Sequence, residues 1–179
     1  MADILYAYKD NVYVNLTNKC DCACRFCIRS HHDGVGDADT LWHKVDPTLE
    51  EIKAAMDAYD FTGKKELVYC GYGEPTCAME NLIESAKYAK EKYGLKIRLN
   101  TNGLGNLYHK RDIVPELAEV VDAVSVSLNA PTQLMHDMRV GTSQLPNVRV
   151  RALTKVSLHF WFVAPLLLLL LWSSKPSST

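Results

Sequence analysis

The chain has 179 residues, a formal net charge of −1 at pH 7 and 47% hydrophobic residues, which predicts one soluble globular domain with a buried core. The balanced charge leaves no basic stripe, so we expect no direct binding of nucleic acid. The N-terminus has neither the basic nor the apolar region of a signal peptide, and we therefore expect a cytoplasmic protein.

The first half of the chain predicts a hairpin, a helix and a strand. Two β-rich runs, residues 4–8 and 11–17, surround a short turn and indicate a hairpin. A helix start follows within residues 46–51. It begins either with Thr48 and Glu51 as a capping box or with Asp46 before Pro47 at the first helical position.

The second half predicts strands that alternate with helices. The expected strands are 66–70, 96–100 and 123–128, and the expected helices are 78–93, capped by Thr76 and ended by Gly94, and 112–121. Such repeats predict parallel strands joined by right-handed crossovers. We therefore predict an α/β fold, a partial (β/α) barrel.

Four of the six cysteines lie between residues 20 and 27, and in a cytoplasmic chain such a group predicts metal ligands rather than disulfides. Cys20, Cys24 and Cys27 have the spacing C-x3-C-x2-C. Three thiolates on one tight loop can bind three irons of a [4Fe–4S] cluster, which leaves one iron open to a small molecule.

A zinc site made by Cys20, Cys22, Cys24 and Cys27 is the alternative, since zinc accepts four thiolates. Zinc sites usually use two separated pairs of cysteines, so we favour the cluster. Cys22 is then a spare small residue. Cys70 and Cys77 are best explained as buried structural cysteines, although either could reach the site.

The spacing of Cys20, Cys24 and Cys27, with Phe26 before the last cysteine, resembles the signature of the radical S-adenosylmethionine (radical SAM) family. The sequence Gly71-Tyr72-Gly73-Glu74-Pro75-Thr76 at the end of a predicted strand resembles that family's Gly-Gly-Glu-Pro motif. The resemblance implies a [4Fe–4S] cluster and SAM as cofactors. It implies reductive cleavage of SAM to a 5′-deoxyadenosyl radical, which abstracts hydrogen from an unknown substrate. It also implies an electron donor such as flavodoxin or ferredoxin.

The resemblance also implies which residues bind SAM. Phe26 would shield the cluster near the adenine, and the SAM amino group would meet the backbone of Tyr72 and Gly73 together with Glu74. The ends of later strands would face the sulfonium and the ribose through Asn100, Ser127 and Asn129. Each of these residues is also common in an ordinary turn or strand end.

A closer resemblance, to the short radical SAM proteins linked to the TatD nuclease family, covers residues 1 to about 140. It is carried by the lead-in at residues 15–18, by Cys22 and by the turn at residues 71–76. It implies a possible functional link to a TatD-type nuclease.

After residue 140 the character of the sequence changes. We predict a core over residues 1–150, with a fifth strand within 148–151, and an atypical apolar tail of low complexity over 151–179. Its apolar run, Leu158 to Trp172, is shorter than the roughly 20 residues of a membrane span. We therefore expect no true span and a barrel that is incomplete at its C-terminal end. The competing hypothesis is a non-catalytic metal-binding or interaction module, or an inactive truncated radical SAM protein.

Overall fold

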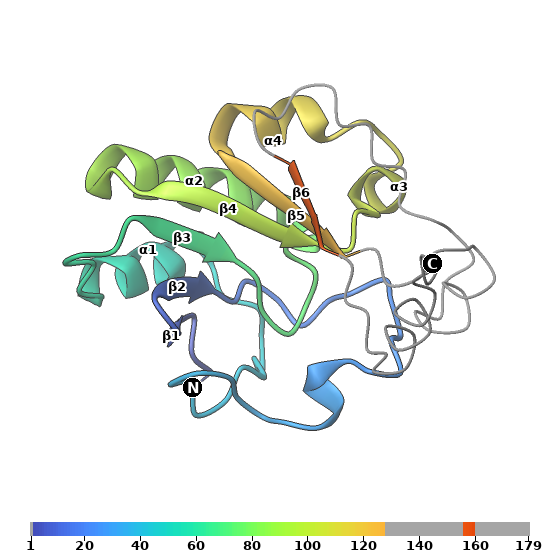
Figure 1. The fold of residues 1–179 in the computed structure, drawn as a ribbon, viewed down its shortest axis with the longest axis horizontal. Coiled ribbons are helices and arrows are strands. Elements are labelled where there is room, and N and C mark those ends of the chain that lie inside the picture. The colour runs from blue at the N-terminus through green and yellow to red at the C-terminus, as the bar shows by residue number, and fades with distance from the viewer. Residues whose placement is uncertain (1, 128–155, 160–179) are drawn as a thin grey trace, which may run out of the picture.

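The computed structural model describes residues 2–127 and 156–159, which build a six-stranded sheet in the order β1-β2-β3-β4-β5-β6 (Figure 1). The strands are β1 (Leu5–Tyr8), β2 (Asn11–Val14), β3 (Glu66–Tyr69), β4 (Lys96–Thr101), β5 (Ala123–Ser127) and β6 (Val156–His159). β1 pairs with β2 in antiparallel fashion, and every later neighbour pair is parallel. A parallel sheet whose strands follow in chain order is an arc of a (β/α) barrel, as predicted.

The helices of the described residues are α1 (Leu49–Ala58), α2 (Met79–Tyr93), α3 (Gly105–His109) and α4 (Val114–Val120), with the short 3-10 turns η1 (Ile28–Ser30) and η2 (Pro75–Ala78). Buried side chains of α1, α2 and α4 form one hydrophobic cluster with those of β2 to β5. These three helices therefore cover the same face of the sheet. The other face carries more polar side chains, including Arg98 and Asn100 of β4.

Local sequence signals account for most element boundaries. Lys9 turns the β1–β2 hairpin with a positive φ of 55°, and Gly94 ends α2 with a φ of 65°. α1 begins with the capping box of Thr48 and Glu51, so this alternative is confirmed. Asp46 instead accepts hydrogen bonds from the Thr17 hydroxyl and the Asn18 N–H.

Two elements differ from the sequence prediction. Thr76 does not cap α2, whose N-cap is Ala78. It lies in η2, where its N–H and hydroxyl donate to the Glu74 carboxylate, so this side chain is used in the turn before the helix. The short helix α3 was not predicted, because it spans barely more than one turn and shows no periodic pattern.

The described residues near the C-terminus continue the sheet beyond residue 150. Val156–His159 pairs in parallel with β5, as Val124 faces Val156 and Ser127 faces His159. The strand expected within 148–151 lies outside the described residues, and the division between a core and a tail stays a prediction. Among the residues that the structure describes, no helix combines the length and the apolar character needed to cross a membrane.

Candidate functional site

The cysteine loop leaves the carboxyl end of β2 and lies on the side toward which the parallel strands point (Figure 1). A short turn orders it, since the Cys27 N–H donates to the Cys24 carbonyl at 3.1 Å. Arg29 holds the rest of the loop, because its guanidinium donates to the carbonyls of Asn18 at 3.2 Å, Tyr72 at 3.4 Å and Cys22 at 3.5 Å. One cation thus fixes both arms of the loop against the turn after β3.

Cys20, Cys24 and Cys27 are partly exposed, whereas Cys22 is buried with 5% of its surface accessible. Hydrogen bonds from Cys22 lower the pKa of Cys20 and lower the pKa of Cys24 to about 7. The neighbouring thiols of Cys20 and Cys24 are the largest causes of a strong rise in the pKa of Cys22, and burial is the next largest. Among these thiols Cys22 therefore keeps its proton, while Cys20 and Cys24 approach the thiolate form that binds metals.

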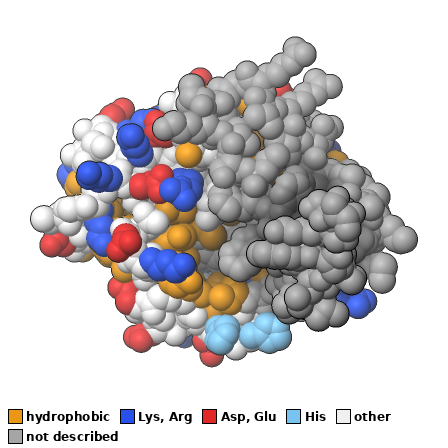
Figure 2. Space-filling model, in the orientation of Figure 1, with side chains coloured by type: hydrophobic (Ala, Val, Ile, Leu, Met, Phe, Trp, Pro, Cys, Tyr) orange, Lys and Arg blue, Asp and Glu red, His pale blue; other side chains and the backbone are white. Residues whose placement is uncertain are grey.

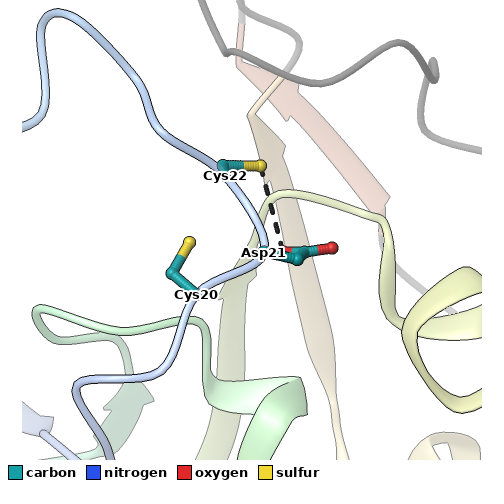
Figure 3. Close-up of side chains that lie close together, drawn as sticks. All are labelled: Cys20, Asp21 and Cys22. Atoms are coloured by element: carbon teal, nitrogen blue, oxygen red, sulfur yellow. Dashed lines mark hydrogen bonds between the residues drawn. The ribbon is translucent and has the colours of Figure 1, made fainter.

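The donor set fits an iron–sulfur cluster. Cys20, Cys24 and Cys27 are soft thiol ligands on one loop that is open to solvent, and two of them have lowered pKa values. The side chains of Cys20, Asp21 and Cys22 also gather closely in the same loop (Figure 3), and their ligand atoms lie within 4.8 Å of one another.

The turn after β3 packs directly against the cysteine loop. The Glu74 N–H donates to the Lys19 carbonyl at 2.7 Å, one residue before Cys20. Gly73 makes this approach possible, because a Cβ there would overlap the carbonyl oxygens of Thr17 and Lys19. Position 73 therefore requires glycine because two backbones lie in close contact there. The family resemblance alone does not give this reason.

Asn15 holds the start of the same turn. Its Oδ1 accepts a hydrogen bond from the Tyr72 N–H at 3.2 Å, and its Nδ2 donates to the Leu41 carbonyl at 2.8 Å. A side chain at Gly71 would overlap Asn15, so the contact with Asn15 explains why glycine stands at position 71 as well. Asn15 is completely buried and joins β2, the turn after β3 and the segment before α1.

Glu74 is 4% exposed, and its carboxylate is bound by donors of this chain. Oε1 accepts from the Thr76 N–H, the Thr76 hydroxyl and the Thr101 hydroxyl, at 3.1, 2.8 and 2.7 Å. Oε2 accepts from the Asn102 N–H at 2.8 Å. Burial raises the pKa of Glu74, and these four hydrogen bonds partly offset that rise. The carboxylate joins the carboxyl ends of β3 and β4.

Asn102 connects Glu74 to the cysteine loop. Its Nδ2 donates to the Asp21 carboxylate at 2.7 Å and lies 3.3 Å from the Cys22 sulfur. Its Oδ1 accepts from the Leu104 N–H at 2.9 Å. The sequence analysis did not predict this contact between the end of β4 and the loop.

Of the other residues predicted to bind SAM, the structure describes Phe26, Asn100 and Ser127. Phe26 in the loop is 48% exposed. Asn100 on β4 has a buried Oδ1 that no described residue bonds, and Ser127 ends β5. Asn129 lies outside the described residues. The structure thus brings the cysteine loop and the Tyr72–Glu74 turn together, and their roles toward SAM stay predictions.

A cavity of about 630 Å³ lies beside η2 and is bordered by Cys77, Met79, His109 and Lys19. None of the residues predicted to bind SAM lines it. Burial is the largest cause that raises the pKa of Cys77 to about 12, and burial likewise raises the pKa of Cys70 to about 11. Both thiols are therefore protonated at neutral pH, which agrees with structural cysteines.

Sequence reasoning missed three polar residues of the site: Asn15, Arg29 and Asn102. Asn15 and Asn102 directly follow strands β2 and β4, and this position at the carboxyl end of a parallel strand is a usable signal. Arg29 gave no such signal, since its three carbonyl partners come from segments that only the fold brings together.

Comparison with known proteins agrees with this geometry. The chain is 22% identical over 138 residues to the dual-specificity RNA methyltransferase RlmN of Wigglesworthia glossinidia brevipalpis. The aligned region covers 73% of the chain and 34% of that protein. A probable RlmN of Prochlorococcus marinus is 25% identical over 137 residues, covering 70% of the chain and 35% of that protein. A putative glycyl-radical enzyme activating enzyme of Methanocaldococcus jannaschii is 43% identical over 63 residues, or 35% of the chain and 24% of that protein.

The chain thus spans about a third or less of the length of these relatives. The profile of the Radical SAM superfamily matches residues 14–168, which include the cysteine loop, the turn after β3 and strands β3 to β6. Because this match covers most of the sequence and both parts of the candidate site, the chain belongs to the radical SAM superfamily.

Proposed function

We propose that this protein binds a [4Fe–4S] cluster through Cys20, Cys24 and Cys27, binds SAM beside it, and cleaves SAM reductively to start hydrogen abstraction from a substrate. The observation that carries the proposal is the contact between the cysteine loop and the turn after β3. The 2.7 Å hydrogen bond from the Glu74 N–H to the Lys19 carbonyl brings the two motifs to one place.

A cluster held by Cys20, Cys24 and Cys27 would supply the single electron that reductive cleavage of SAM to methionine and a 5′-deoxyadenosyl radical requires. The residues of this chain bind and orient the reactants. The low pKa of Cys24 keeps a thiolate ready for iron at neutral pH. Glu74 uses its carboxylate on Thr76, Thr101 and Asn102, so its role is to position the backbone of Tyr72 and Gly73 for the SAM amino group.

The reaction needs a reductant of low potential, and we propose flavodoxin or ferredoxin as the donor. One relative is named for RNA methylation and another for activating a glycyl-radical enzyme. Because these names differ in target while the superfamily shares SAM cleavage, the proposal extends to hydrogen abstraction and leaves the substrate class open. The link to the TatD family and the cytoplasmic location stay predictions.

The test is anaerobic reconstitution of the chain with iron and sulfide, followed by reduction and EPR spectroscopy with and without SAM. We expect a [4Fe–4S]⁺ signal whose shape changes when SAM is added, and 5′-deoxyadenosine among the products. Cys24→Ala should lose the cluster, whereas Cys77→Ala should keep both the signal and its response to SAM, since Cys77 lies outside the loop.

The competing hypothesis of a non-catalytic metal module makes a different prediction. A cluster whose EPR signal is unchanged by SAM, or tightly bound zinc with no cluster at all, would contradict SAM cleavage. SAM binding and cleavage are measured without a substrate, so the result does not depend on knowing the target.

A further inference from the structure

Cys22 is the one thiol of the loop that the proposed function does not use. It lies beside two proposed cluster ligands, because Cys20 and Cys24 both pack against the small cluster of Cys22 and Leu104. Its sulfur also lies 3.9 Å from the Asp21 carboxylate, the contact drawn as a dashed line in Figure 3. Cys22 is buried against Leu104, whereas Asp21 is exposed to solvent.

The spacing of these donors suits one metal ion better than a cube of iron and sulfur. Two thiolates on a tetrahedral zinc ion, each about 2.3 Å from the metal, lie about 3.8 Å apart. The ligand atoms of Cys20, Asp21 and Cys22 lie within 4.8 Å of one another, so shifts of about 1 Å or less would bring them to zinc distances. Cluster ligands bind different irons and must lie farther apart.

We propose that the cluster-free loop binds one Zn²⁺ ion through Cys20, Asp21 and Cys22, with Cys24 as the fourth donor, and that this site excludes the cluster. Zinc displaces the protons that remain on the three thiols, these protons pass to solvent, and no electron is transferred. Thiolates prefer zinc to ferrous iron, which makes zinc the stronger competitor at equal concentration. Zinc binding itself is independent of the proposed function, and only the competition with the cluster rests on it.

Asn102 supports the site from the end of β4. Its Nδ2 donates to the Asp21 carboxylate and lies 3.3 Å from the Cys22 sulfur, so it orients two of the donors. Ligands held by such outer hydrogen bonds need less reorganisation to bind a metal. The same side chain follows the strand whose Thr101 bonds Glu74, which couples this metal state to the junction at which SAM is proposed to bind.

The first experiment titrates the full metal-free chain with zinc, anaerobically and against a chromophoric zinc chelator. We expect one zinc per chain. Cys22→Ser should weaken binding by at least about tenfold, since a lost ligand should cost no less than a lost outer hydrogen bond. Cys77→Ser is the matched control and should bind as the wild type does. Cobalt titration counts the thiolates by the intensity of the sulfur-to-cobalt absorption, which should fall in Cys22→Ser.

The second experiment adds one equivalent of zinc before reconstitution with iron and sulfide. Zinc should lower the cluster yield of the wild type far more than that of Cys22→Ser, and the EPR response to SAM should be the same in both. Circular dichroism shows whether Cys22→Ser is folded, and Cys22→Ala provides a second test of the same ligand.

Two results would overturn the proposal: zinc affinity unchanged in both Cys22 variants, or a SAM-free EPR signal that changes in them and so identifies Cys22 as a cluster ligand. Zinc binding that depends on Cys22 in a protein whose cluster ignores SAM would support the zinc site and refute the proposed function. The two hypotheses therefore fail separately.

Discussion

The Thr101 hydroxyl donates a 2.7 Å hydrogen bond to the Glu74 carboxylate, and this contact joins the end of β4 to the turn after β3. Glu74 is 4% exposed, so its charge is held by hydrogen bonds rather than by water. The adjacent Asn102 donates to the other oxygen of the carboxylate and reaches the cysteine loop through its side chain. One buried carboxylate thus organises the junction of three segments.

Glu74→Gln should destabilise the protein by about 1–3 kcal/mol, because the new amide NH₂ cannot accept the hydrogen bond of a buried N–H. If the amide oxygen keeps the Thr101 contact, the Asn102 N–H loses its partner. Urea unfolding measures the change. Glu80→Gln, at an exposed position in the first turn of α2, is the matched control and should change the midpoint only slightly, because only the interaction of its charge with the helix dipole is lost. Equal midpoints for the two variants would show that the Glu74 charge is not needed.

Gly73→Ala should lower the iron content after reconstitution to well below that of the wild type. The added Cβ overlaps the carbonyls of Thr17 and Lys19, so the lead-in to Cys20 must move. Such overpacking also costs about 1–3 kcal/mol of stability. Iron and sulfide analysis measures the effect. In Gly63→Ala, where open space surrounds a strained φ of 76°, stability should fall while the iron content is retained.

Cys24 should react with iodoacetamide at half its maximal rate near pH 7 in the metal-free protein. Its pKa is lowered to about 7 chiefly by the hydrogen bond from Cys22, and the thiolate fraction that reacts rises as the pH rises through this value. Cys70 and Cys77, with pKa values of about 11 and 12, should stay unreactive there. Peptide mass spectrometry follows each site separately.

Removal of the Cys22 hydrogen bond tests the cause of this shift. In Cys22→Ala the alkylation profile of Cys24 should move to higher pH, toward the ordinary cysteine value of about 8.5. A profile that stays near pH 7 would assign the low pKa to the Arg29 charge, which lowers it to a smaller extent.

Thr48→Ala should cost about 1 kcal/mol of stability, the typical value of a helix N-cap. The Thr48 hydroxyl accepts from the Glu51 N–H, and the Glu51 carboxylate accepts from the Thr48 N–H, so the substitution breaks one half of the capping box. Urea unfolding compares it with Thr62→Ala, at an exposed position outside any helix. A cost as small as that of Thr62→Ala would mean that α1 does not depend on its cap.

Much of the fold could be predicted because its signals are local. The hairpin, the capping box at Thr48, the left-handed Gly94 and strands β3 to β5 each depend on residues that are neighbours in sequence. The range of α2 was predicted to within one residue, but its cap was not, because Thr76 could serve the helix or the turn. Thr76 bonds the Glu74 carboxylate, which also accepts from Thr101 of β4, and these contacts place Thr76 in the turn.

The sequence by itself determined the superfamily and the three candidate cluster ligands. The separation of Cys20, Cys24 and Cys27 along the chain is part of the sequence and does not depend on the fold. It also placed the glycine- and glutamate-bearing turn at a strand end. Only the tertiary structure decided that Gly73 packs on the cysteine loop, that Glu74 bonds Thr101, and that Asn102 reaches Cys22. These partners come from segments that follow different strands, and the parallel pairing of β2, β3 and β4, which places their carboxyl ends at one edge, is not visible in any local stretch of the sequence.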